Sequence, residues 1–270
     1  MPPYAYNVVV GAVALVAAAI TVWTFAPAFR GPEAARRDVG SHRLAFGCIV
    51  AVLLLSTLAS LPFVQDLRDA PFTLATFALA ALATQIPLLL VLYVRLIWPR
   101  ALSWQDLGLR PLPLEQVLRV GSITGISVLL LTIVVSLALS RLDLRPNQLE
   151  QYTFVRQAGI PGLIVVLVLV AVTAPIAEEL FFRGFLFGVY RRRQPRWLAY
   201  AVSVAAFSIA HVMPTRMNPQ QALGLVIAIV LLGTILTWTY ERTGSLYPGM
   251  VAHAINNATG VLALYYVGST

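Results

Sequence analysis

Eight apolar runs, each about as long as a bilayer is thick, constrain the fold of this chain more than any other feature. A membrane-spanning helix needs about 20 largely apolar residues. Of the 270 residues, 59% are hydrophobic and 11% are charged, against roughly 25% charged residues in soluble domains. We therefore predict an all-α fold, a polytopic transmembrane helical bundle with about eight spans. The expected spans cover residues 7–29, 44–64, 72–94, 117–139, 160–190, 197–213, 220–240 and 246–267.

The distribution of arginine predicts how these spans are oriented. The net charge of +8 is carried by arginine, since the chain has no lysine. A basic chain often indicates a nucleic-acid partner, but these arginines lie in short loops, where positive charge marks the cytoplasmic side. We therefore expect the loops after the first, third and fifth runs to be cytoplasmic and both termini to face outward across the plasma (inner) membrane. The arginine-rich loops hold Arg30, Arg36, Arg37 and Arg43, then Arg95, Arg100, Arg110 and Arg119, then Arg191, Arg192, Arg193 and Arg196. The loops with fewer arginines hold Arg68, then Arg141, Arg145 and Arg156, then Arg216.

Two adjacent carboxylates lie deep in the fifth run, where ionised groups are costly and indicate function. Glu179 precedes Arg183 by four residues, the favourable order for a helical ion pair, so we expect Arg183 to neutralise Glu179. Glu178 lies about 100° around the helix and is left without a partner in that helix. A clasp that only packs helices together would need one acid, not two. Pro175, just before the pair, predicts a kink.

Three further polar residues lie in the last three runs. His253 and Asn257 are four residues apart and share one helix face, while His211 lies two runs earlier. At about 1.5 Å per residue, Glu178, His211, His253 and Asn257 lie roughly 21, 21, 16 and 22 Å from the cytoplasmic ends of their spans. These similar depths predict that the four side chains meet inside the bundle.

This set of side chains suits the hydrolysis of an amide. A carboxylate with a neutral histidine can activate water as a general base, and an asparagine amide with a histidine can stabilise an oxyanion. Two histidines and a carboxylate, here Glu178, His211 and His253, could also ligate zinc and leave a position for water. Any zinc would be held from separate helices. The single cysteine, Cys48, excludes a disulfide framework and a cysteine metal site.

Three short motifs on these runs resemble a known family. EELFFR (residues 178–183) resembles the EExxxR motif of the CPBP intramembrane proteases, the group that contains type II CAAX prenyl endopeptidases and bacteriocin-processing or immunity proteins. FSIAH (207–211) is similar to its FxxxH motif, and HAINN (253–257) to its HxxxN motif, in the same order. WQDLGLR (104–110) resembles a weaker upstream element. The resemblance predicts a CPBP-like domain over 101–270, with its core at 160–268, preceded by spans one to three at 1–100.

The resemblance implies an endopeptidase that cleaves peptides or proteins at the membrane. Its catalytic residues would be Glu178 and His211, which would activate the attacking water, and His253 and Asn257, which would bind the oxyanion or complete a metal site. Three more residues would have supporting roles. Glu179 and Arg183 would hold the site together, and Phe207 would pack against His211 and fix its rotamer.

Two other functions stay open on the sequence alone. Buried carboxylates also serve in ion-coupled transporters, although the chain has no evident inverted repeat of the kind many transporters carry. A non-catalytic immunity protein or membrane scaffold could keep the same fold without turnover. The expected partners are the lipid bilayer and a peptide or protein substrate at the membrane, not nucleic acid.

Overall fold

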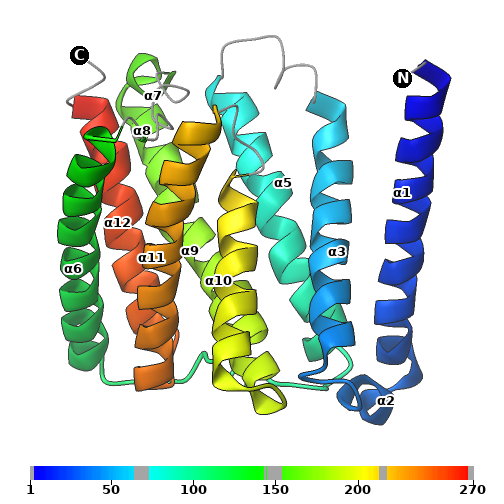
Figure 1. Cartoon of the computed structure of the whole chain (residues 1–270). Coiled ribbons are helices and arrows are strands. Elements are labelled where there is room, and N and C mark those ends of the chain that lie inside the picture. The colour runs from blue at the N-terminus through cyan, green and yellow to red at the C-terminus, as the bar shows by residue number, and fades with distance from the viewer. Residues whose placement is uncertain (1–2, 64–72, 143, 145–153, 213–217, 267–270) are drawn as a thin grey trace.

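Long helices, side by side, make up the whole of the described chain. The computed structural model describes residues 3–63, 73–142, 144, 154–212 and 218–266, and within these residues every regular element is helical. Figure 1 shows the helices as one bundle. The prediction of an all-α polytopic bundle is confirmed. The longest helices are α1 (Pro3–Phe25), α3 (His42–Ser60), α5 (Leu74–Leu92), α6 (Leu114–Ser140), α10 (Arg196–Val212), α11 (Pro219–Thr243) and α12 (Tyr247–Tyr266).

Helices occupy all eight predicted positions, but six of them are long and apolar enough to cross a membrane by themselves. Within the described residues α10 has 17 residues, which is short for a span. The other exception, α12, is 20 residues long and carries the polar group His253, Asn256 and Asn257, which lowers its hydropathy. The six candidate spans are Gly11–Arg30, His42–Phe63, Leu74–Ile97, Leu114–Ser140, Gly159–Arg192 and Pro219–Thr243.

The arginine-rich segments gather at one end of the bundle. Figure 1 shows α2 (Pro32–Arg36), the linker between α5 and α6, and the start of α10 at the same end, while α1 begins and α12 ends at the opposite end. This arrangement agrees with the predicted orientation, in which that end is cytoplasmic. Three arginines of the poorer loops, Arg68, Arg145 and Arg216, lie outside the described residues.

Arg95, expected in the loop after the third run, is buried. Arg95 lies in the π-helical segment η3 (Tyr93–Ile97) and its side chain is fully buried. Its guanidinium donates to the carbonyl oxygens of Thr24 at 2.8 Å and Ala35 at 3.2 Å and pairs with Asp38. The structure differs here from the expected loop position, because a buried guanidinium can satisfy several acceptors at once. Arg95 ties α1 and α2 to the end of α5.

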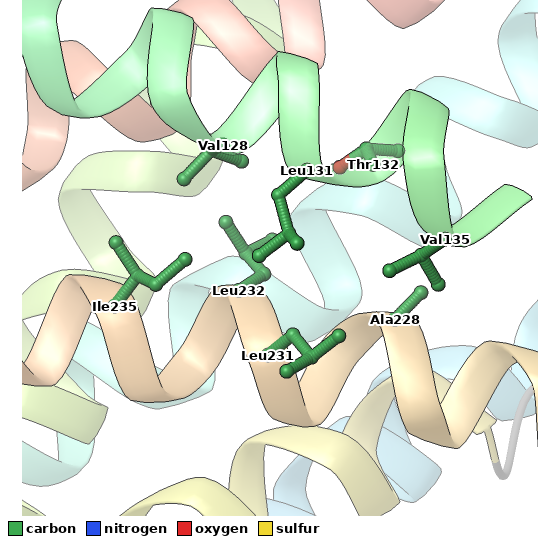
Figure 2. Close-up of a pocket in the computed structure, with 8 residues that line it drawn as sticks. All are labelled: Val128, Leu131, Thr132, Val135, Ala228, Leu231, Leu232 and Ile235. Atoms are coloured by element: carbon green, nitrogen blue, oxygen red, sulfur yellow. The ribbon is translucent and has the colours of Figure 1, made fainter.

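Helices α6 and α12 pack closely because α6 has small residues at the contact. A Cβ on Gly121 would lie 2.6 Å from the Cβ of Val251, and one on Gly125 would lie 3.0 Å from Ile255. Glycines four residues apart allow two membrane helices to approach in this way. The neighbouring contact between α6 and α11 leaves a cavity of only about 10 Å³, lined by the side chains that Figure 2 shows. That volume holds about one water, so this cavity is not a ligand site.

The linker before α6 docks against the fifth span. Leu107 is fully buried, and the carbonyl oxygen of Gly108, at φ +97°, accepts a hydrogen bond of 2.9 Å from the backbone N–H of Leu246. Arg192 donates to the backbone oxygen of Asp106 at 3.0 Å. The WQDLGLR segment therefore packs across the arginine-rich end of the bundle. There it contacts the start of α12 and the end of the fifth span.

We expect Gly184→Ala to undock this linker. A Cβ on Gly184 would lie 2.3 Å from the carbonyl oxygen of Leu107, a backbone atom that cannot rotate away. Alanine normally stabilises a helix interior by about 1 kcal/mol relative to glycine, so a fall in the melting temperature in detergent would come from the clash. The matched control is Gly260→Ala in α12, where a Cβ meets nothing within 4 Å. Equal melting temperatures for the two variants would contradict the docking.

Candidate active site

The fifth span switches from α-helical to π-helical winding twice, once before and once at the two carboxylates. It consists of α8 (Gly159–Leu167), the π-helical η5 (Val168–Thr173), α9 (Ala174–Glu178), the π-helical η6 (Glu179–Val189) and η7 (Tyr190–Arg192). Pro175 is at the start of α9. Because proline lacks a backbone N–H, the helix widens into η5 before it and continues as one span. Such π-segments are frequent at functional sites.

A glutamine from another span holds η5. The side chain of Gln85, on α5, donates through Nε2 to the carbonyl oxygen of Leu169 at 3.1 Å, and its Oε1 accepts a hydrogen bond of 2.6 Å from the Thr173 hydroxyl. Gln85 is buried, so these bonds satisfy polar groups that would otherwise be costly in the bilayer. The contact fixes the turn that leads directly to Glu178.

Glu178 faces two histidines from two other helices. Its Oε2 lies 3.8 Å from Nε2 of His211, on α10, and 3.7 Å from Nε2 of His253, on α12. The side chains of Glu178 and His211 are 17% and 28% exposed, whereas that of His253 is 2% exposed. The structure thus brings together three of the four residues that the sequence singled out. It leaves an open side at Glu178 and His211.

The hydrogen bonds of the two imidazoles fix which nitrogen carries a proton. Nδ1 of His211 lies 2.8 Å from the carbonyl oxygen of Phe207, and Nδ1 of His253 lies 2.9 Å from Oε1 of Glu179. Both oxygens accept, so both Nδ1 atoms donate. A neutral imidazole protonated on Nδ1 has its lone pair on Nε2. Three acceptor atoms, the two Nε2 and the Glu178 oxygen, therefore converge on one region.

Glu179 lies on the inner side of this group, where it links Arg183 and His253. Its Oε1 accepts from Nη1 of Arg183 at 2.9 Å as well as from His253, and the side chains of both charged residues are fully buried. The predicted pairing of Glu179 with Arg183 is present, and the bond to His253 is an addition that the sequence did not indicate. A carboxylate on the second nitrogen of a histidine fixes its tautomer and its orientation.

Arg183 joins the helices around the site. Its Cζ lies 4.1 Å above the ring of Phe207, and Nη2 lies 3.5 Å from the carbonyl oxygen of Gly233 on α11. The Phe207 ring also contacts both histidines, with centroids 4.4 Å from His211 and 5.9 Å from His253. Phe207 is fully buried. It therefore packs against His211 as expected and also supports His253 and Arg183.

Asn257 lies one turn beyond His253. Its Nδ2 donates to the carbonyl oxygen of Val170, in η5, at 2.9 Å, and its Oδ1 accepts from Asn256 at 3.2 Å. One hydrogen of the Asn257 amide is therefore committed to the backbone of the π-segment. A primary amide has two such hydrogens, so one donor is left for another acceptor.

The donor types at this site suit zinc. Among the residues that the structure describes, no group of three or more histidine, cysteine, aspartate or glutamate side chains is arranged to hold a metal ion. The Nε2 atoms are 3.8 and 3.7 Å from the Glu178 oxygen, a little wider than the roughly 3.3–3.4 Å between two tetrahedral ligands of one zinc ion.

The segment that carries these residues matches a known family. Residues 160–259 match the family described as type II CAAX prenyl endopeptidase Rce1-like. This segment belongs to that family. The Rce1-like segment contains all seven residues that the sequence singled out, from Glu178 to Asn257. No curated protein and no solved structure matches the chain significantly.

Gln85 lies outside the Rce1-like segment, and the sequence analysis missed it. Gln85 is neither ionisable nor part of a family motif. The available signal was a glutamine in an otherwise apolar span, followed two residues later by Pro87. An uncharged amide in a membrane helix needs a partner, and here the partner is the turn before Glu178. The division of the chain at residue 100 stays a prediction.

Proposed function

We propose that this multi-pass membrane protein is an intramembrane endopeptidase in which Glu178 activates a water molecule. The observation that carries the proposal is the contact of Glu178 Oε2, within 4 Å, with the Nε2 atoms of His211 and His253 on two other helices. The polar contact between Glu178 and each histidine is too long for a direct hydrogen bond. A water between three acceptors can donate its hydrogens to two of them.

The proposed reaction begins with the removal of a proton from water. Glu178 takes the proton, the water oxygen attacks the carbonyl carbon, and the carbonyl π electrons move onto its oxygen. His211, held by the Phe207 carbonyl, orients the water. When the tetrahedral intermediate collapses, the C–N bond breaks and Glu178 returns the proton to the leaving amine. The products are a new carboxylate and a new amino terminus.

His253 and Asn257 are proposed to stabilise the oxyanion. In this step the His253 ring would carry a proton on both nitrogens, unlike the neutral ring of the resting site, because Nδ1 already donates to Glu179. Asn257 would donate its second amide hydrogen. An oxyanion donor of this kind is worth about 10²–10³ in rate.

The family description points to a first substrate class. The family description, type II CAAX prenyl endopeptidase, suggests that the substrate is a peptide with a prenylated cysteine near its C-terminus. The apolar surroundings of the site suit a substrate that lies in the membrane. We propose such peptides as the first to test, with unprenylated peptides of the same sequence beside them. The inner membrane is the proposed location.

A cleavage assay tests this proposal. Purified protein in proteoliposomes would be incubated with prenylated and unprenylated membrane-associated peptides, and fragments would be identified by mass spectrometry. We expect fragments from the wild type and none from His211→Ala. Proton or ion flux that depends on Glu178, without fragments, would instead favour a transporter. Full function of the Glu178→Ala variant in cells would favour a non-catalytic immunity or scaffold protein.

We expect activity to survive the removal of metal ions. If Glu178 and the histidines act directly on water, treatment with a zinc chelator followed by gel filtration should leave kcat within about twofold of its starting value. Elemental analysis of the same sample would confirm that the metal is gone. Loss of activity that returns with added zinc, together with zinc bound by the wild type and absent from His211→Ala, would contradict the direct mechanism and favour a metallopeptidase.

A further inference from the structure

An open pocket lies at the arginine-rich end of the bundle, far from Glu178 along the chain. It has a volume of about 420 Å³ and lies where α2, the end of η3 and the start of the linker meet. Its walls include Arg36, Arg100, Ser103, Trp104 and Asp106. None of these residues belongs to the Rce1-like segment or to the site described above. The pocket lies at the seam between the first three spans and the linker that closes the bundle.

The pocket has an excess of positive charge. Nη2 of Arg36 donates to the carbonyl oxygen of Arg100 at 2.9 Å, which holds its guanidinium at the rim. Among the described residues, the Arg100 guanidinium has no hydrogen bond or ion pair, and Arg36 has no carboxylate partner. Arg100 is also the only described residue other than glycine at positive φ, 55°, a conformation that is uncommon and often marks a functional position.

The one acid of the pocket is already balanced. Asp106 accepts from the backbone N–H of Ser103 at 3.0 Å and from its hydroxyl at 2.7 Å, and it pairs with Arg192 at 3.4 Å. The bond from the Ser103 backbone, then the hydroxyl, then Arg192 lower the pKa of this carboxyl below its usual value. Asp106 therefore stays ionised and paired with Arg192, and two guanidiniums remain without a counter-charge.

Aromatic residues next to the pocket indicate the membrane surface. The rings of Phe29 and Trp98 meet edge to face with centroids 5.3 Å apart, and both side chains are exposed. Exposed aromatic residues at span ends mark the level of the lipid headgroups. Basic pockets between membrane helices on the cytoplasmic side bind anionic headgroups. A ligand in this pocket would thus meet two guanidiniums without a counter-charge at the depth of lipid phosphates.

We propose that this pocket binds the phosphate of an anionic phospholipid from the cytoplasmic leaflet. Arg36 and Arg100 hold the phosphate through charge-assisted hydrogen bonds, and Trp104 lies beside the headgroup. The lipid fills the seam between α2 and the linker, so it stabilises the docking of the first spans onto the rest of the bundle. This inference is independent of the proposed peptidase activity.

The test is a lipid titration of the full chain followed by native mass spectrometry. Short-chain phosphatidylglycerol is compared with phosphatidylcholine of the same chain length. We expect the wild type to retain phosphatidylglycerol preferentially and the double variant Arg36→Gln/Arg100→Gln to bind it about tenfold more weakly or less, since two charge-assisted contacts are lost. Phosphatidylglycerol should also raise the melting temperature of the wild type and not of the double variant.

Two further variants separate the pocket from general surface charge. The control Arg37→Gln/Arg119→Gln removes the same charge at the same end, from exposed positions that do not line the pocket, and should bind like the wild type. Arg100→Lys keeps the charge and should retain most of the binding. The proposal fails if Arg36→Gln/Arg100→Gln binds phosphatidylglycerol as the wild type or the control does. It also fails if the wild type binds inorganic phosphate but does not distinguish the two lipids. A double variant that changes only the KM for peptide cleavage, with lipid binding unchanged, would overturn it as well.

Discussion

Glu178→Gln should reduce kcat/KM for peptide cleavage by about 10²–10⁴, the usual contribution of a general base. The substitution keeps the size of the side chain and removes the group that takes the proton. Because Glu178 is 17% exposed and makes no direct hydrogen bond to either histidine, the variant should fold and melt like the wild type. The measurement is the initial rate of fragment formation in proteoliposomes at equal protein concentration.

Glu115→Gln is the matched control for this result. Glu115 is an acid in the first turn of α6, exposed and away from the histidines, so its loss should leave the rate unchanged. The companion Glu179→Gln should behave differently from Glu178→Gln, with a lower melting temperature as well as lower activity. A Glu178→Gln variant that keeps more than about a tenth of the activity would show that another group is the base.

Arg183→Met should destabilise the protein by about 3–5 kcal/mol, the usual effect of removing one partner of a buried ion pair. Methionine keeps much of the apolar stem over Phe207 but leaves Glu179 buried and without its cation. Unfolding in mixed micelles with increasing denaturing detergent would measure the loss. Because Glu179 also holds His253 at 2.9 Å, activity should fall together with stability.

The double variant Arg183→Met/Glu179→Gln tests whether the loss of stability comes from an unpaired buried charge. When both charges are removed, no buried charge is left unpaired, so the double variant should be more stable than Arg183→Met alone. Arg196→Met is the matched control, since its ion pair with Glu241 is exposed on the arginine side and such pairs contribute little. Equal losses for Arg183→Met and Arg196→Met would contradict the assigned role of the buried pair.

Much of the bundle could be predicted because the lipid restricts what a chain can do. Runs such as 44–64 and 220–240 must be helices, since lipid leaves no other partner for their backbone groups. The depth of Glu178, His211 and His253 followed from helix rise alone, and these three side chains do come together. The pairing of Glu179 with Arg183 followed from a spacing of four residues within one helix.

The remaining features depend on contacts between distant segments, which spacing does not encode. Gln85 reaches η5 across 84 residues, and Arg95 reaches Thr24 and Asp38 across 71 and 57 residues. The second bond of Glu179, to His253, depends on how the fifth span and α12 are rotated about their axes. Residue spacing does not give that rotation. The same holds for Asn257, whose bond to the Val170 carbonyl arises from the π-segment before Pro175.

The most direct test of the account follows the oxygen of the attacking water. Purified wild-type protein and Glu178→Gln would be incubated with a membrane-associated peptide in water enriched in oxygen-18, and the fragments weighed by mass spectrometry. The account predicts a fragment from the wild type whose new carboxylate carries one labelled oxygen, and no fragment from Glu178→Gln. Labelled fragments formed equally by both proteins, or no fragments from the wild type across the peptides tested, would contradict it.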